Sequence, residues 1–342
     1  MTPTNALSKL VLVALLGVFT CACADKAQEL PGLDSGTPAA VAPEVQAPVA
    51  PALEGTEPLA DLVATPAGDP VLFRPAKEGQ WKYQVELRQK AATLFPGRKP
   101  MVSDISQTFV LTLAVKPLED GKLEARYGIE NMKIVPLGPD GKPAEGSFER
   151  IQQFSAALQG VSAVRKLDPQ TGAVLDFQVE SKGALAPGVK EIFSQLLRDL
   201  TYSWPADPKK PGETWDSGLE DKQARAGGDS VIKISATTTF VGATSLEGVP
   251  CLLLRTQGTL DEVGTLKRQG ILGSTRGAGN LQKAVVLDPA GGLIIKLAAR
   301  STMTRNTIFA KAGDSMGHQE DLALTLNATL LDTAKEAANG GK

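Results

Sequence analysis

A regular alternation of apolar and polar residues from position 81 restricts the fold more than any other feature of the chain. The apolar residues of this segment are Trp81, Tyr83, Val85 and Leu87, and the polar residues between them are Lys82, Gln84, Glu86 and Arg88. Because successive side chains of a strand point to opposite faces, the segment predicts a strand with one buried and one solvated face. Residues 105–115 repeat the pattern, and Asp120-Gly121 supplies a tight turn before a third alternating segment at 123–129. The sequence therefore predicts a mainly β fold with few helices, built on an antiparallel meander.

Two segments have helical spacing instead. The first, residues 147–159, starts at Ser147, a suitable N-cap. The second and stronger segment starts at Pro187 and runs to about residue 201. The stripe of this second segment consists of Val189, Ile192, Phe193, Leu196, Leu197 and Leu200. We expect the amphipathic helix at 187–201 to pack on the sheet, where it either completes a filled core or roofs an apolar cavity.

A short motif occurs twice. LDPQTG, Leu167 to Gly172, returns as LDPAGG, Leu287 to Gly292. In this pattern aspartate accepts backbone hydrogen bonds, proline presets its backbone angle and glycine takes the left-handed exit, so both copies predict turns rather than a ligand site. Their spacing predicts two similar antiparallel β-units, at 76–203 and 207–333, forming curved sheets or half-barrels. The alternative is that a β-rich chain simply reuses the same turn chemistry.

The N-terminus predicts export. Residues 1–22 carry one cation at Lys9 and an apolar run from Leu10 to Phe19, which has the length of a signal peptide and is too short to span a bilayer. The end of this segment, Phe19 to Cys23, resembles the lipobox of bacterial lipoproteins. That resemblance implies lipid attachment at Cys23, with Cys21 as the alternative site. Because Ala24 rather than aspartate follows, it also implies delivery to the outer membrane, facing the periplasm or the surface.

Residues 23–75 are rich in proline and alanine and poor in aromatic residues. This composition buries too little apolar area to offset the entropy of ordering. We therefore expect a lipidated cysteine followed by a disordered tether over 23–75, and a flexible tail at 334–342.

Composition argues against several kinds of chemistry. Lys and Arg number 36 and Asp and Glu 38, without a basic block, which does not suit a nucleic-acid partner. One histidine and three cysteines are too few for a zinc or iron–sulfur site, so a metal site would have to be all-oxygen. No motif points to such a site or to a reaction, and we expect no metal, no cofactor and no catalytic residue. We expect His318 on the surface, Cys251 in a buried strand, and the glycine-rich run Gly264 to Asn280 as a flexible loop rather than a phosphate-binding one.

Taken together, the lipobox-like signal, the Pro/Ala-rich tether and the repeated β-unit resemble bacterial envelope lipoproteins of an uncharacterised β-rich family. The resemblance implies a membrane-anchored protein with a non-enzymatic binding or structural role. A carrier of lipid or lipoprotein acyl chains in a sheet-and-helix cavity is the alternative, and an envelope hydrolase is a third. The expected partners are the membrane, through the N-terminal lipid, and an envelope protein or lipid ligand; the oligomeric state is left open.

Overall fold

The structure is a computed structural model that describes residues 44–66, 68–76, 78–138, 140–144, 149–158, 160–181, 196–197, 204–225, 228–268, 271–290, 292–311 and 314–331. The predictions for residues 1–22, Cys23, Ser147 and 334–342 lie outside these residues. So do four members of the predicted helical stripe: Val189, Ile192, Phe193 and Leu200.

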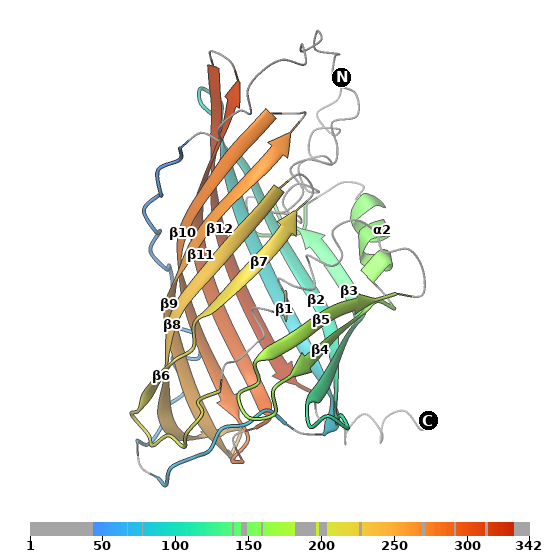
Figure 1. The fold of residues 1–342 in the computed structure, drawn as a ribbon, viewed down its shortest axis with the longest axis vertical. Helices are drawn as coiled ribbons and strands as arrows, with labels where there is room; N and C mark the ends of the chain where they lie inside the picture. Colours follow the sequence, from blue (N-terminus) through green and yellow to red (C-terminus); the bar gives the residue numbers. More distant parts are fainter. Residues whose placement is uncertain are drawn as a thin grey trace.

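A single antiparallel sheet of 12 strands forms the body of the described chain (Figure 1). The strands are β1 (Gly79–Leu94), β2 (Met101–Pro117), β3 (Leu123–Pro136), β4 (Ser162–Leu167), β5 (Val174–Glu180), β6 (Thr214–Asp216), β7 (Leu219–Arg225), β8 (Gly228–Leu246), β9 (Val249–Arg268), β10 (Ile271–Leu287), β11 (Ile294–Lys311) and β12 (Asp314–Leu330). The helix α2 (Glu149–Leu158) joins β3 to β4, and its Ser155 hydroxyl donates to the carbonyl oxygen of Met132 on β3 at 2.6 Å. The expected mainly β, antiparallel fold is confirmed, and α2 lies within the segment 147–159 that was predicted to be helical.

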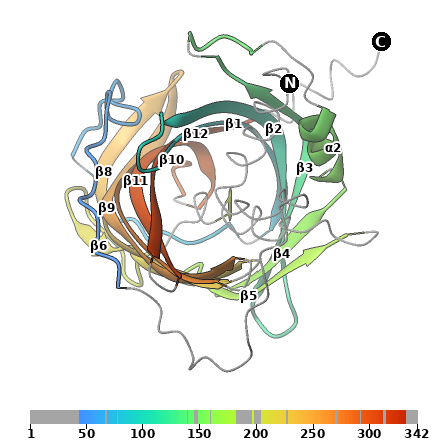
Figure 2. The same ribbon diagram turned by 90° about the horizontal axis from the view of Figure 1, so that it is seen from above.

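The first and last strands join the two halves of the chain. β1 pairs with β12, with Tyr83 opposite Leu330, so the strand order runs β5-β4-β3-β2-β1-β12-β11-β10-β9-β8-β6, with β7 also on β8. The sheet curls into a ring that the described strands do not close, because β5 and β6 do not pair (Figure 2). The two predicted units thus contribute to one continuous sheet, and their origin by duplication stays a prediction.

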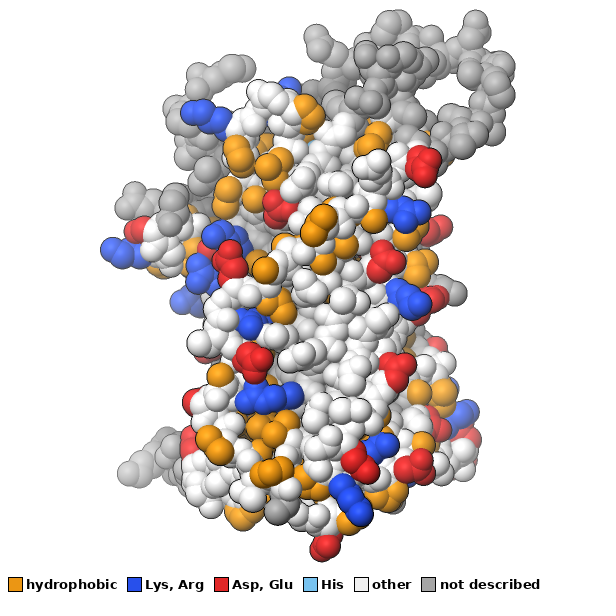
Figure 3. Space-filling view, turned by 90° about the vertical axis from the view of Figure 1, so that its left-hand side faces the viewer, with side chains coloured by type: hydrophobic (Ala, Val, Ile, Leu, Met, Phe, Trp, Pro, Cys, Tyr) orange, Lys and Arg blue, Asp and Glu red, His pale blue; other side chains and the backbone are white. Residues whose placement is uncertain are grey.

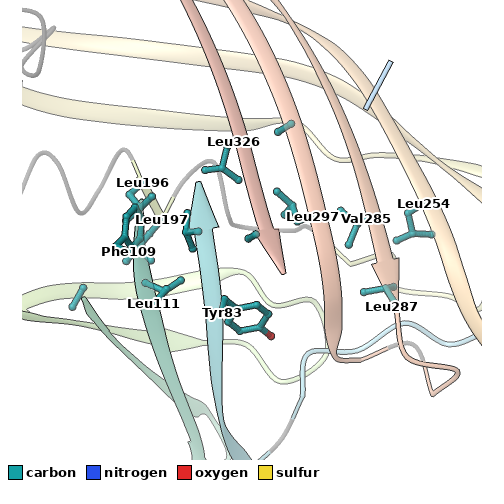
Figure 4. Packing of buried hydrophobic residues seen from close by; sticks show 14 of the residues in the cluster. Tyr83, Phe109, Leu111, Leu196, Leu197, Leu254, Val285, Leu287, Leu297 and Leu326 are labelled. Atoms are coloured by element: carbon teal, nitrogen blue, oxygen red, sulfur yellow. The ribbon is translucent and has the colours of Figure 1, made fainter. Parts of the chain in front are cut away.

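Strand alternation gives the curled sheet two different faces. Apolar side chains that face inward form the main core, among them Phe109, Leu111, Leu254, Leu297 and Leu326 (Figure 4). The convex face carries polar and charged groups, including the ion pairs Lys82–Glu130 and Arg88–Asp104. Figure 3 shows side chains of both charges scattered over one outer side of the molecule.

Two residues of the predicted amphipathic helix are described, and both are helical and buried. Leu196 and Leu197 belong to the core on the concave face and lie beside Phe109 in Figure 4. This is the packing on the sheet that the stripe predicts for these two positions. Within the described residues, no helix combines the length and hydropathy needed to cross a bilayer.

Residues 44–66, which we call the strap, lie along the convex face. Arg255 donates to the carbonyl oxygens of Pro58 and Leu59, both at 3.1 Å. Arg300 donates to those of Glu54 at 2.7 Å and Gly55 at 2.6 Å. The composition of these residues predicted part of a disordered tether. In the structure they are bound because two arginines of the sheet supply donors to the strap's carbonyl groups.

Cys251 lies on β9 beneath the strap. It is buried in a small cluster with Leu253 and Val286, against which Leu59 and Leu62 of the strap pack. The prediction of a buried strand cysteine is confirmed, and among the described residues Cys251 is a free thiol.

The expectation of a flexible loop over Gly264 to Asn280 is wrong. Apart from residues 269–270, which are not described, this segment forms the end of β9 and much of β10, with Gly273 opposite Leu266. The glycines are there because neighbouring strands come close. A Cβ atom on Gly279 would lie 2.1 Å from the carbonyl oxygen of Thr302. Any side chain at position 279 would therefore force β10 and β11 apart.

Candidate functional site

A cavity of about 100 Å³ lies at one end of the curled sheet and is partly open to solvent. Its lining consists of Pro75, Ala76, Trp81, Tyr83, Leu113, Val115, Ala125, Tyr127, Arg165, Leu167, Gly172, Trp204, Gly292, Leu293 and Ile294. Gly172 and Gly292 are the last residues of the two Leu-Asp-Pro motifs. The fold therefore brings both motifs to the rim of one cavity, although they lie 120 positions apart.

The prediction that these motifs are turns is confirmed. The Asp168 carboxylate accepts hydrogen bonds from the backbone N–H groups of Gln170 at 2.9 Å and Thr171 at 2.7 Å. The Asp288 carboxylate accepts from Gly292 at 2.8 Å and Leu293 at 2.7 Å. Both carboxylates are therefore bound to backbone groups of their own turns.

Asp168 gives the turn a pH-dependent stability. Hydrogen bonds from the Thr171 backbone and hydroxyl, followed by the Gln170 backbone, lower the pKa of Asp168. A lowered pKa contributes stability that is present above the unfolded value of about 3.9 and is lost as the pH falls further. We expect Asp168→Ala to cost roughly 0.5–1 kcal/mol at pH 7, because the carboxylate is only half-buried and water screens its charge. Urea unfolding at pH 7 and pH 3 should show the deficit shrinking at pH 3; an equal deficit at both would contradict this role.

Aromatic rings make up much of the cavity wall. Trp81 and Tyr83 come from β1, Tyr127 from β3, and Trp204 from the segment before β6. Desolvation is the largest cause of a raised pKa for both Tyr83 and Tyr127, so both phenols are neutral at ordinary pH. Behind Trp204, Phe73 stacks on it at a centroid distance of 6.2 Å and is itself fully buried. These rings give the cavity a rigid apolar wall.

Arg165 on β4 is the charged residue among those that line the cavity. It is 7% exposed, and its Nη1 donates to the carbonyl oxygen of Leu197 at 3.2 Å. Its guanidinium lies over the rings of Tyr127 at 5.9 Å and Phe177 at 5.7 Å. Such contacts attract a cation electrostatically and help to hold a buried charge. Arg165 was not among the candidate residues predicted from the sequence.

A second buried polar group lies elsewhere on the concave face. Arg305 of β11 donates to Glu262 at 2.7 and 2.9 Å and to Glu320 at 3.0 Å, and all three side chains are buried. Burial by itself lowers the pKa of Arg305, but the two carboxylates outweigh burial and raise it. Arg305 lies eleven residue steps along β11, about 36 Å, from Ile294 at the cavity. We therefore assign this triad a structural role.

Neither His318 nor Cys251 is among the described residues that line the cavity. His318 is half-buried rather than exposed, with its ring 5.4 Å from that of Phe95 and 6.4 Å from that of Phe309. Over the described part of the chain, no group of three or more histidine, cysteine, aspartate or glutamate residues could hold a metal ion.

No family model and no curated protein matches the chain. Among solved structures, OccK2 of Pseudomonas aeruginosa is 6% identical, with a TM-score of 0.23, over 76% of this chain and 100% of that one. OccAB4 of Acinetobacter baumannii is 7% identical, with a TM-score of 0.19, over 75% and 99%. OmpT, an outer membrane protein of Vibrio cholerae, is 10% identical, with a TM-score of 0.18, over 73% and 100%. Scores this low establish no common fold, and the function must come from this chain's own residues.

Proposed function

We propose that the protein is a lipid-anchored component of the bacterial cell envelope that acts by binding an apolar ligand rather than by catalysis. The aromatic cavity at the end of the sheet carries this proposal. Recognition sites are typically concave, mostly apolar and equipped with a few polar groups, and this cavity combines aromatic rings with one arginine. Among the described residues of its lining, no nucleophile is paired with a base, which suits binding better than covalent catalysis.

The two faces of the sheet support the same proposal. Charged pairs such as Arg88–Asp104 occupy the convex face, where they are compatible with water. The apolar side chains gather on the concave face and end at the cavity. Such a sheet offers an apolar molecule a protected place while its own outer face stays hydrated.

A carrier of lipid or lipoprotein acyl chains is the second candidate. Leu196 and Leu197 favour it, because they fill the concave face where an acyl chain would lie. The cavity of about 100 Å³ is smaller than the roughly 300–1,000 Å³ of typical ligand pockets. A carrier would therefore need these leucines to leave the core when an acyl chain enters.

Tryptophan fluorescence tests the proposed site. Two of the three tryptophans, Trp81 and Trp204, line the cavity. Titration of the full-length protein with 1-octanol should change the emission and saturate, whereas a change that stays linear to the solubility limit would reject the site. Native mass spectrometry of protein purified from envelopes separates the candidates, because a stoichiometric lipid adduct favours the carrier.

The anchor is tested by labelling. We expect Cys23→Ser to abolish incorporation of labelled palmitate and to release the protein from membranes, because the single lipidated residue is lost. Cys21→Ser is the matched control and should still be labelled. The reverse result would move the attachment site to Cys21, and labelling of both variants would reject a single lipidated cysteine.

A further inference from the structure

The strap covers an apolar patch on the convex face of the sheet. Cys251, Leu253 and Val286 form a buried cluster there, and Leu59 and Leu62 of the strap pack against it. Removal of the strap would expose this cluster to water, which is unfavourable for apolar surface. The strap therefore controls whether the patch is accessible.

The sheet holds the strap by its backbone carbonyl groups. The side-chain amide of Asn280 and the hydroxyl of Thr302 both donate to the carbonyl oxygen of Pro51, at 2.8 and 3.0 Å. They add to the four hydrogen bonds that Arg255 and Arg300 donate to carbonyl groups further along the strap. All these donors belong to β9, β10 and β11, and these bonds recognise the backbone of the strap rather than its side chains.

The strap has little burial of its own. All residues from 44 to 66 are described, and Val45 is the only buried one among them. Val49 and Val63 are 89% and 84% exposed. Ordering each residue costs conformational entropy, and a segment with few buried apolar contacts opens locally at a lower free energy than the strands of a core. Such a segment is expected to leave the sheet before the strands unfold.

The strap ends at a firm attachment to β8. The backbone N–H of Thr65 donates to the carbonyl oxygen of Ala243 at 2.7 Å, and the N–H of Ala243 donates back at 3.2 Å. Gly242 makes room for this contact, since a Cβ atom there would lie 2.1 Å from the carbonyl oxygen of Thr65. Thr65 is therefore the point about which the preceding residues can swing away.

We propose that residues 44–64 open as a unit about Thr65 while the sheet stays folded, and that this opening controls access to the apolar patch and to the thiol of Cys251. In the closed state, the carbonyl groups of the strap occupy the donors of Arg255 and Arg300. In the open state, these donors and the patch face solvent on the convex side. The opening needs neither the cavity nor the lipid anchor, so it goes beyond the proposed function.

Reaction of Cys251 with a thiol reagent measures the opening. In the full-length chain with Cys21→Ser and Cys23→Ser, Cys251 is the only thiol left. Its reaction rate with excess dithiobis-nitrobenzoate, divided by the rate of the urea-unfolded protein, gives the fraction of molecules in which the thiol is open. We expect this fraction to exceed the globally unfolded fraction, obtained by urea titration, at least about a hundredfold. Equal fractions would overturn the local opening.

A substitution confined to the strap tests which segment opens. Gly55 has a φ of 84°, which a side chain disfavours, so Gly55→Ala should weaken the closed state and raise the rate at Cys251 at least about threefold. The control is Gly97→Ala, which places the same kind of strain, at a φ of 69°, in the turn between β1 and β2 and should leave the rate unchanged. No rise in Gly55→Ala, or an equal rise in both variants, would overturn the proposal.

Substitution of Arg300 tests the donors of the sheet. Arg300→Met removes two hydrogen bonds from a charged group to the strap and should raise the rate at least about tenfold. Arg126→Met is the control on the convex face, because Arg126 bonds to Glu180 of β5. A rate in Arg300→Met no higher than in this control would mean that the carbonyl contacts do not hold the strap closed, and the proposal would fail. Gly55→Ala decides even if Arg300→Met does not fold.

Discussion

Phe73→Ala is expected to destabilise the fold by about 3–5 kcal/mol, the cost of removing a large aromatic side chain from a filled core. Phe73 is fully buried. Its ring stacks on Trp204 and Trp215, at centroid distances of 6.2 and 5.8 Å, and meets the edge of Phe240 at 5.1 Å. It follows the strap and leads into β1, so it fixes this part of the chain to the end of the sheet where the cavity lies.

Leu72→Ala is the matched control, because the neighbouring side chain is 44% exposed and should cost less than about 0.5 kcal/mol. Both variants are compared by urea unfolding followed by tryptophan fluorescence, with circular dichroism as a second probe. Equal, negligible effects would mean that residues 68–76 belong to a flexible tether after all. Phe73→Leu should recover part of the loss, since it refills most of the space.

Arg305→Met is also expected to lower the stability of the fold strongly, by about 3–5 kcal/mol at pH 7. Removing one partner of a buried ion pair leaves an uncompensated buried charge, and here two carboxylates, Glu262 and Glu320, lose their shared partner. Thermal unfolding at pH 7 measures the difference between the variant and wild type.

The control is Arg88→Met, which removes an exposed partner of Asp104 on the convex face. The arginine side chain of this pair is 53% exposed, so its loss should cost less than about 1 kcal/mol. A cost as small as this in Arg305→Met would contradict the stabilising role of the buried ion pairs.

The strands were predictable where apolar and polar residues alternate without interruption. Residues 81–88 and 105–115 lie in β1 and β2 as expected, because one polar and one apolar face suffice to define a strand. The run Gly264 to Asn280 was wrongly predicted to be a loop, and the error has a physical reason. Glycine usually disfavours strands, yet here Gly279 gives a neighbouring strand the room that a side chain would take.

The strap could not be predicted from its own composition. Pro- and Ala-rich segments bury little apolar area, and no residue pattern within 44–66 predicts which groups of the sheet bind this segment. The partner groups are Arg255 and Arg300, about 200 and 250 positions further on, whose donors face the convex side of the sheet. Order here comes from the sheet and not from the segment itself.

Only part of the candidate site could be predicted from the sequence. The two Leu-Asp-Pro turns were recognised, but their meeting at one cavity depends on how the sheet curls. Arg165 carried a usable signal, because it occupies an inward position between Ala163 and Leu167 on β4, where an apolar residue is the rule. Glu320 stands in the same phase as Leu322 and Leu324 on β12. A charged residue in the apolar phase of a strand marks an interior group that a search for catalytic motifs overlooks.

Because the strap is bound to the sheet, it limits how far the sheet can lie from an anchor at Cys23. With an anchor at Cys23, only 21 residue steps separate the lipid from Glu44, where the described strap begins, and a fully extended chain of that length spans at most about 75 Å. A tether reaching to residue 75 would span about 190 Å by the same rule. With the proposed anchor at Cys23, the folded sheet would be confined to a shallow layer over its own membrane leaflet, and a ligand of the proposed cavity would have to be taken up and released within that layer.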